Sequence, residues 1–259
     1  MNELDTFIDE IRASESTKLT YWKRLNQFQK VYGHMPESSA EAQEYVRKRE
    51  DAGLAPATIG LDVAALLRYL KYRGLDTHRL ERMPVMLKTP QYLTQDEISA
   101  LIANCNQLVG KTMIALLYDS GARISEILGV KVEDVDWNGA LRVTRKGGRQ
   151  EFANVSGWGM NYLAQWMDRR TGDHPKVFGS RNYNDMYRIL KSAGMKAKLP
   201  HFHPHMLRHS RAIHLRQQGV DWAEIGYQLG HVNPTITIKY YTRPDTFDLK
   251  QVIPPVTLA

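Results

Sequence analysis

Apolar residues recur every three or four positions along most of the chain, which is the period of an amphipathic α-helix. The first clear stripe of this kind comprises Trp22, Leu25, Phe28 and Val31. A later stripe follows Pro56, a residue suited to a first helical turn, and stops at Gly74, a residue suited to a helix end. We therefore predict a small all-helical domain over residues 1–82.

Two prolines interrupt the helical period, and we predict a linker over residues 83–91. Directly after it, Thr94 and Glu97 have the spacing of a capping box, which marks the first helix of a second domain over residues 92–259. The period changes once in this domain, where two short strand-like runs flank Gly147-Gly148. The pattern predicts a mainly α protein whose second domain is mixed α/β, mostly helical with a small antiparallel sheet.

Composition narrows the class of protein further. The chain has 35 Lys and Arg against 28 Asp and Glu, a net charge of +7, which favours a polyanionic partner. One cysteine excludes an intramolecular disulfide, and no apolar run of about 18 residues predicts a membrane span. The acidic N-terminal segment is not typical of a signal peptide, so we expect a cytoplasmic protein with no membrane partner.

Histidines and arginines gather in the segment "HPHMLRHSRAIH", residues 203–214, which holds four of the nine histidines. Pro204 suits a first helical turn, so His205 and Arg208 are expected one turn apart on one face. The segment could be a zinc site, a set of surface and capping histidines, or half of a phosphate-binding active site. Pro204 and the lack of a nearby cysteine or carboxylate argue against zinc. The segment alone does not decide between the other two.

Three further segments carry residues with two interpretations each. In "SGARISEIL", Arg123 precedes Glu126 by three residues, which taken singly is an ordinary helical ion pair. In "LGH", Gly230 is suited to end a helix and His231 follows it. The segment "NPTITIKYYT" places two tyrosines in what is expected to be a last helix.

Taken together and in this order, the segments resemble the tyrosine recombinase (phage integrase) family, and its Xer-like site-specific recombinases in particular. The family has an arginine in a G-A/L-R-I-S-E box, a lysine on a β-hairpin, an H-x-x-R box, an L-G-H box and a tyrosine nine residues later. The resemblance runs from about Leu93 to Tyr240. It identifies the candidate catalytic residues as Arg123, Lys146, His205, Arg208, His231 and Tyr240.

The resemblance implies a helical N-terminal core-binding domain, a catalytic domain with a C-terminal tail, and a site-specific DNA recombinase. Its reaction is attack of the Tyr240 oxygen on a DNA phosphodiester, which leaves a 3′-phosphotyrosyl bond. Arg123 and Arg208 would bind the phosphate where negative charge develops. These two cations take the place of a metal ion, so neither a metal nor another cofactor is expected.

The remaining residues have implied roles in proton transfer and orientation. His205 would accept the tyrosine proton, Lys146 would protonate the leaving oxygen, and His231 would donate a hydrogen bond to the phosphate. Glu126 is expected to orient Arg123.

Two departures from the family pattern leave alternatives open. The hairpin reads Arg145-Lys146-Gly147-Gly148 where relatives often have Gly-Lys-Gly, so Arg145 is an alternative cation to Lys146. The tyrosine is doubled, so Tyr241 is an alternative nucleophile to Tyr240.

The implied partners are double-stranded DNA and three further copies of the chain, which form a homotetramer on two DNA sites and exchange strands in pairs through a Holliday junction. Accessory DNA-bending proteins are a further class of candidate partner. Other arginines are expected to contact backbone phosphates, namely Arg142, Arg145, Arg149, Arg169 and Arg170. The alternatives are a type IB topoisomerase-like enzyme that relaxes DNA and a non-catalytic DNA-binding protein of the same fold.

Overall fold

The computed structural model describes residues 2–80, 91–145 and 147–230. The chain divides into two compact units, residues 1–87 and 88–259, and each is described by itself. The predicted linker lies almost wholly within residues 81–90, outside the described residues, so the domain limits at 82 and 92 stay predictions.

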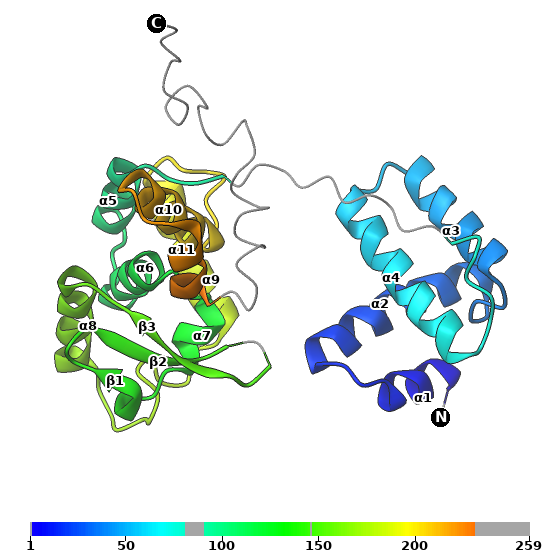
Figure 1. The fold of residues 1–259 in the computed structure, drawn as a ribbon, viewed down its shortest axis with the longest axis horizontal. Coiled ribbons are helices and arrows are strands. Elements are labelled where there is room, and N and C mark those ends of the chain that lie inside the picture. Colours follow the sequence, from blue (N-terminus) through cyan, green and yellow to red (C-terminus); the bar gives the residue numbers. More distant parts are fainter. Residues whose placement is uncertain (1, 81–90, 146, 231–259) are drawn as a thin grey trace, which may run out of the picture. The chain divides into compact units, whose positions relative to one another are not determined.

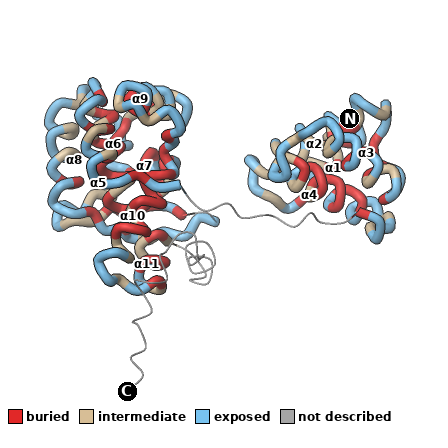
Figure 2. Tube along the Cα trace, turned by 90° about the horizontal axis from the view of Figure 1, so that it is seen from above, coloured by how far each residue is buried: buried red, intermediate tan, exposed pale blue. Residues whose placement is uncertain are grey.

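The first unit is a bundle of helices (Figure 1). Its elements are α1 (Glu3–Glu10), α2 (Glu15–Tyr32), α3 (Ser39–Asp51) and α4 (Pro56–Tyr72). The side chains of Asn2, Ser14 and Ser38 cap the first three helices by accepting hydrogen bonds from backbone amides of the first turn. Helix α4 contacts both α2 and α3, and it carries more of the buried apolar residues than any other helix of the unit (Figure 2).

The apolar stripe of α2 is only half buried. Leu25 and Phe28 are fully buried, whereas Trp22 is 37% exposed and Val31 is 55% exposed. Each step of three residues falls short of a full helical turn by about 60°, so the ends of this stripe lie on opposite sides of the helix. The stripe therefore predicts the helix correctly, but only its two central positions, Leu25 and Phe28, face the core.

The second unit is mostly helical with a three-stranded sheet, as predicted from the sequence. Its helices and strands are α5 (Gln95–Ala103), α6 (Leu108–Ser120), α7 (Ile124–Gly129), a 3₁₀ turn η1 (Val132–Asp134), β1 (Val135–Asp136), β2 (Ala140–Thr144), β3 (Gln150–Asn154), α8 (Gly157–Arg169), α9 (Tyr183–Lys196), α10 (His205–Gln217) and α11 (Trp222–Leu229). The predicted capping box at Thr94 and Glu97 is present at the start of α5.

The sheet has the order β1-β2-β3 and is antiparallel, with Leu141 opposite Ala153. Along β2, residues point alternately inward and outward, so Leu141 and Val143 are buried. Gly147 and Gly148 both have positive φ and belong to the turn between β2 and β3, as their sequence predicts. The two-residue strand β1 was not expected from the hydrophobic pattern.

Helix α6 lies at the centre of the second unit and contacts α5, α8, α9 and α10. Ten of its thirteen residues are buried, and Figure 2 shows α6, α7 and α10 as the main buried segments. A helix buried on nearly all sides is held rigidly, so the loop at its C-terminal end has a well-defined place. Among the helices that the structure describes, none is long and apolar enough to cross a membrane.

Candidate active site

The corner between α6 and α7 presents Arg123. Helix α6 ends at Ser120 and is capped by Gly121, whose φ of 63° is in the left-handed region that favours glycine. A Cβ at Gly121 would lie 2.5 Å from Leu229 Cδ2, so this position also needs glycine to allow the close approach of α11. Two residues later Arg123 adopts an extended conformation and serves as the N-cap residue of α7.

Glu126 holds Arg123 at two points. Its Oε2 accepts a hydrogen bond from the Arg123 amide at 2.8 Å, and its Oε1 accepts one from Arg123 Nη1 at 2.7 Å. Burial disfavours the charged form of Glu126, but these hydrogen bonds and the charges of Arg145 and Arg123 outweigh it and lower its pKa. Glu126 is therefore an ionised, buried carboxylate that orients an arginine with a 38% exposed side chain.

Arg208 lies on α10 and is 2% exposed. Its Nη1 donates a hydrogen bond of 2.6 Å to the carbonyl oxygen of Gly121. This bond joins α10 to the α6–α7 corner, although the two residues are 87 positions apart in sequence. The corner that carries Arg123 and the helix that carries Arg208 are thus fixed to each other.

His205 is the first residue of α10 and lies one helical turn before Arg208. It lines a pocket of about 300 Å³ together with Arg123, and Tyr183 contributes from α9. His205 as a residue is exposed, but desolvation of its ring by the surrounding protein, with the charges of Arg208 and Arg123, lowers its pKa to about 4. His205 is therefore neutral at pH 7 and can accept a proton.

Three of the six predicted catalytic residues, Arg123, His205 and Arg208, are brought together in this way. The other three, Lys146, His231 and Tyr240, lie outside the described residues, as does the alternative nucleophile Tyr241. Their assignment stays a prediction. The structure does describe the residues directly before two of them, which are Arg145 and Gly230.

Arg145 is buried, with 4% of the residue exposed. Its Nη1 donates to Glu126 Oε2 at 2.7 Å, its Nε to Glu151 Oε2 at 3.2 Å, and its Nη2 to the Gln228 carbonyl oxygen at 3.4 Å. The expectation that Arg145 contacts a DNA phosphate is therefore wrong, because all three nitrogens of its guanidinium donate to protein acceptors. The same contacts argue against Arg145 as the alternative to Lys146.

The role of Arg145 was missed in the sequence, although a signal was present. Arg145 directly follows β2, and Glu151 lies on β3, the strand that pairs with it. Opposite charges on paired strands attract one another, so this pair could have been anticipated. The contact with Glu126, nineteen residues away, has no local signal.

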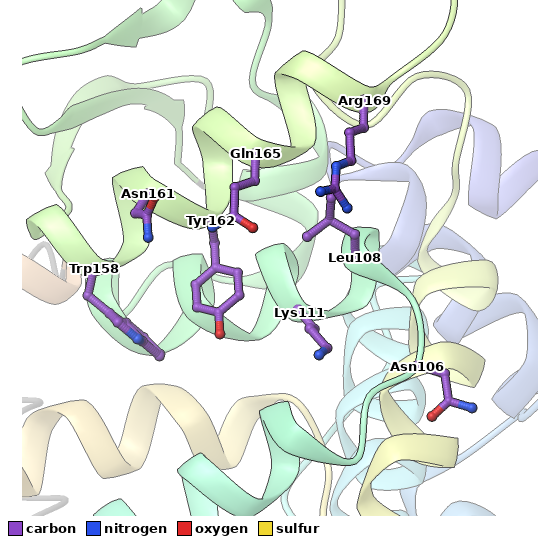
Figure 3. A pocket seen from close by; sticks show the side chains of 8 residues that line it. All are labelled: Asn106, Leu108, Lys111, Trp158, Asn161, Tyr162, Gln165 and Arg169. Atoms are coloured by element: carbon purple, nitrogen blue, oxygen red, sulfur yellow. The ribbon is translucent and has the colours of Figure 1, made fainter.

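A second pocket, of about 420 Å³, lies between the N-terminal end of α6 and one face of α8 (Figure 3). It contains none of the three described catalytic candidates, and its lining includes Lys111, Gln165 and Arg169. Arg169 is exposed there, as expected for a residue that contacts a phosphate. Arg170 instead donates hydrogen bonds to the carbonyl oxygens of His174 and Lys176, so its guanidinium stabilises the loop after α8.

The histidine-rich segment does not form a metal-binding cluster in the part of the chain that the structure describes. There, no three His, Cys, Asp or Glu side chains are placed to hold one ion. His205 and His209 instead pack edge to face, with ring centroids 4.6 Å apart.

The family model and the most similar relatives point to the same protein family. The model of the phage integrase family matches residues 91–246. Tyrosine recombinase XerA of Pyrococcus furiosus is 30% identical over 98% of this chain and 92% of the relative. Tyrosine recombinase XerA of Pyrococcus horikoshii is 28% identical, with the same coverage of both chains.

Solved structures share the fold at low sequence identity. XerH site-specific recombinase, in a post-cleavage complex with palindromic difH substrate, has a TM-score of 0.77 and 18% identity, covering 96% of this chain and 82% of XerH. A dimer of lambda integrase (75–356) bound to a COC′ core site has a TM-score of 0.70 and 16% identity, covering 90% of this chain and 95% of that one. Because the family model spans residues 91–246 of 259, the chain belongs to the phage integrase family and is an enzyme of the Xer-like tyrosine recombinase type.

Proposed function

We propose that this chain is a site-specific DNA recombinase that cleaves and rejoins double-stranded DNA through a 3′-phosphotyrosine on Tyr240. The observation that carries the proposal is the convergence of two arginines and a neutral histidine on one corner. Arg208 is bonded to Gly121, two residues before Arg123, and His205 lines the pocket beside Arg123. Relatives solved with their DNA sites, XerH with difH and lambda integrase with its core site, support DNA as the partner.

The two arginines match the charge that the reaction develops. When the Tyr240 oxygen attacks phosphorus, the five-coordinate intermediate carries one more negative charge than the diester. Guanidinium groups stay protonated at any working pH and bind phosphate oxygens through paired N–H donors. Arg123 and Arg208 are held by protein contacts before DNA arrives, so they need little reorganisation when that charge appears.

Proton transfer accompanies both bond changes. The bond between the Tyr240 oxygen and phosphorus forms, the phosphorus–O5′ bond breaks, the phenol proton passes to His205, and Lys146 protonates the leaving O5′. The pKa of His205, lowered to about 4, keeps its ring neutral at pH 7, which is the form that can accept a proton. Attack by a second 5′ hydroxyl reverses these steps and reseals the strand, since one ester of phosphate is exchanged for another.

The roles proposed for Lys146 and His231 are supported by the described residues next to them in the sequence. Lys146 follows Arg145, and the bond from the Gly148 amide to the Arg145 carbonyl, 3.0 Å, closes the turn between β2 and β3. His231 follows Gly230, which ends α11 with a φ of 69°. The Arg145 guanidinium packs against Gly230, so the residues that precede Lys146 and His231 are in contact. We assign His231 to hydrogen bonding with a phosphate oxygen.

We further propose that four copies of the chain act on two DNA sites and exchange strands in pairs through a Holliday junction. The paired-exchange scheme fits the chemistry, because exchange between two sites, unlike resealing of the same strand, needs a 5′ hydroxyl that another subunit has released. Accessory DNA-bending proteins would assist by bringing the two sites together.

The proposal is tested by covalent trapping. Purified protein is incubated with nicked suicide substrates made from DNA of its own genetic neighbourhood, and the adduct is mapped by mass spectrometry. Tyr240→Phe should keep the fold and DNA binding and abolish the adduct, whereas Tyr241→Phe should still form it. An adduct on Tyr241 would reassign the nucleophile, and the absence of any adduct with the wild-type chain would favour a non-catalytic DNA-binding protein.

A second assay separates recombination from topoisomerase activity. A type IB topoisomerase relaxes supercoiled plasmid without any special sequence, whereas a site-specific recombinase needs its site. We expect no relaxation of plasmid that lacks the mapped site. Efficient relaxation of such a plasmid would favour the topoisomerase-like alternative.

A further inference from the structure

The guanidinium of Arg145 joins three segments of the second unit. It contacts Glu126 on α7 at 2.7 Å, Glu151 on β3 at 3.2 Å, and the Gln228 carbonyl oxygen on α11 at 3.4 Å. Its side chain is 2% exposed. Because a buried arginine is costly unless it is paired, contacts of this kind hold their segments in one arrangement.

Glu126 is shared between this buried arginine and Arg123. Glu126 Oε2 accepts hydrogen bonds from Arg145 Nη1 and the Arg123 amide, while Oε1 accepts one from Arg123 Nη1. Arg123 has a 38% exposed side chain and lines the pocket, whereas Arg145 is enclosed. One carboxylate is therefore fixed between a cation that faces the pocket and a cation that does not.

This sharing decides how much positive charge remains at the pocket. If Glu126 were paired with Arg123 alone, the carboxylate would cancel the charge that a phosphate needs. With Arg145 on its other side, the three groups carry a net charge of +1, and Glu126 can orient Arg123 without neutralising the pair. Arg145 also pairs with Glu151, and Glu151 Oε1 in turn lies 2.5 Å from Arg149 Nη2. Charges therefore alternate in sign along a row of five side chains that starts at Arg123 and ends at Arg149.

Arg145 also determines the packing at the end of α11. A Cβ at Gly230 would overlap the Arg145 guanidinium, so this glycine lets the chain pass directly against it. In sequence, Arg145 precedes Lys146 and Gly230 precedes His231. The contact therefore fixes the described backbone from which both predicted residues continue.

From this convergence we propose that Arg145 is a positioning residue for the recombination reaction, acting through Glu126 to set the place and the charge of Arg123. Its contacts with β3 and α11 hold the backbone that leads into Lys146 and His231. The inference rests on the proposed function, because it assigns a role to Arg145 in strand cleavage. Arg145 itself does not touch the phosphate.

The test compares Arg145→Met and Arg145→Lys with a control, Arg188→Met. Arg188 lies on α9, and its exposed guanidinium bonds Asp185 at the surface. For each variant, single-turnover cleavage of the suicide substrate is measured across a pH series, together with DNA affinity and thermal unfolding. We expect Arg145→Met to cleave about 10- to 100-fold more slowly than the control, because misplacing a phosphate-binding group costs this much.

Two readouts separate positioning from a general loss of folding. In Arg145→Met, Glu126 loses a cation that lowers its pKa, so the acidic limb of the rate profile should move to higher pH. Arg145→Lys should return that limb towards the wild-type position but only part of the rate, since one ammonium cannot reach both carboxylates. DNA affinity should stay near that of the control.

The outcomes are distinguishable. Rates of both Arg145 variants equal to the control rate would overturn the inference, and so would a loss that follows the unfolded fraction with an unchanged pH profile. If Arg145→Met does not fold, the rate and pH profile of Arg145→Lys decide alone. Absence of an adduct from the wild-type chain defeats the proposed function, whereas an adduct unaffected at Arg145 defeats only the positioning role.

Discussion

Arg208 Nη1 donates a hydrogen bond of 2.6 Å to the carbonyl oxygen of Gly121. Through this bond a residue of α10 holds the end of α6, and Arg123 lies only two residues further along the chain. Both guanidinium groups that are proposed to bind the phosphate are therefore positioned by the α6–α7 corner. Arg123 belongs to this corner, and Arg208 is hydrogen-bonded to it.

Replacement of Arg208 tests this relationship. Arg208→Ala should lower the free energy of unfolding by about 1–3 kcal/mol, because the buried Gly121 carbonyl loses its donor. It should also slow covalent adduct formation by about 100-fold or more, as expected for the loss of a group that stabilises developing charge. Denaturant unfolding and single-turnover cleavage measure the two effects, and Arg188→Ala, with a 76% exposed side chain, is the control. An unchanged cleavage rate in Arg208→Ala would remove Arg208 from the active site.

The lowered pKa of His205 predicts how stability depends on pH. The folded chain holds this ring neutral down to about pH 4, whereas the unfolded chain protonates it below about 6.5. Between these values the unfolded state binds more protons, so this residue makes stability fall as pH falls from 6.5 towards 4. In His205→Gln that contribution is absent, and the unfolding free energy should depend less steeply on pH in this window. Parallel curves for the two proteins would show that the ring is not desolvated.

Bound DNA should oppose this shift in the His205 pKa. A phosphate beside the ring favours its protonated form, so the same residue can return a proton during resealing. Titration of His205 by NMR, with and without a DNA duplex that carries the mapped site, should show a higher pKa in the complex. A pKa that DNA does not raise would place the phosphate away from this histidine.

Lys146 is predicted to be the acid that protonates the leaving oxygen. Lys146→Ala should slow cleavage of an ordinary strand, and replacement of the leaving oxygen by sulfur should restore the rate, because a thiolate leaves without a proton. The variant Arg145→Ala should not be rescued in this way, since an arginine does not readily give up its proton. Rescue of Arg145→Ala but not of Lys146→Ala would exchange the two assignments.

Metal independence follows from the two arginines. Because Arg123 and Arg208 supply the positive charge at the phosphate, adduct formation should proceed at the same rate in EDTA as in magnesium. The control is a metal-dependent nuclease in the same buffers. Activity that disappears in EDTA and returns with a divalent ion would revive a metal site, for which the histidine-rich segment around His205 is the first candidate.

The sequence by itself determined the features that depend on neighbouring residues. The helical period, the Thr94–Glu97 capping box and the hairpin turn at Gly147-Gly148 each arise from interactions within a few positions, and each is present in the structure. The order and spacing of short motifs were likewise enough to select Arg123, His205 and Arg208, which the fold brings to one corner. Helical spacing alone already placed His205 and Arg208 on one face of α10.

Only the tertiary structure decided which side chains are enclosed and what they hold. Arg142, Arg145 and Arg149 lie close together in the sequence and look equally suited to contact DNA, yet of these three only Arg145 is buried. It is buried because Glu126 and the end of α11 pack against its guanidinium. In α2, likewise, the helical pattern did not reveal that Trp22 and Val31 turn away from the core. Burial depends on which distant segments meet, and the contact between Arg208 and Gly121 spans 87 residues, far beyond the range of any local rule.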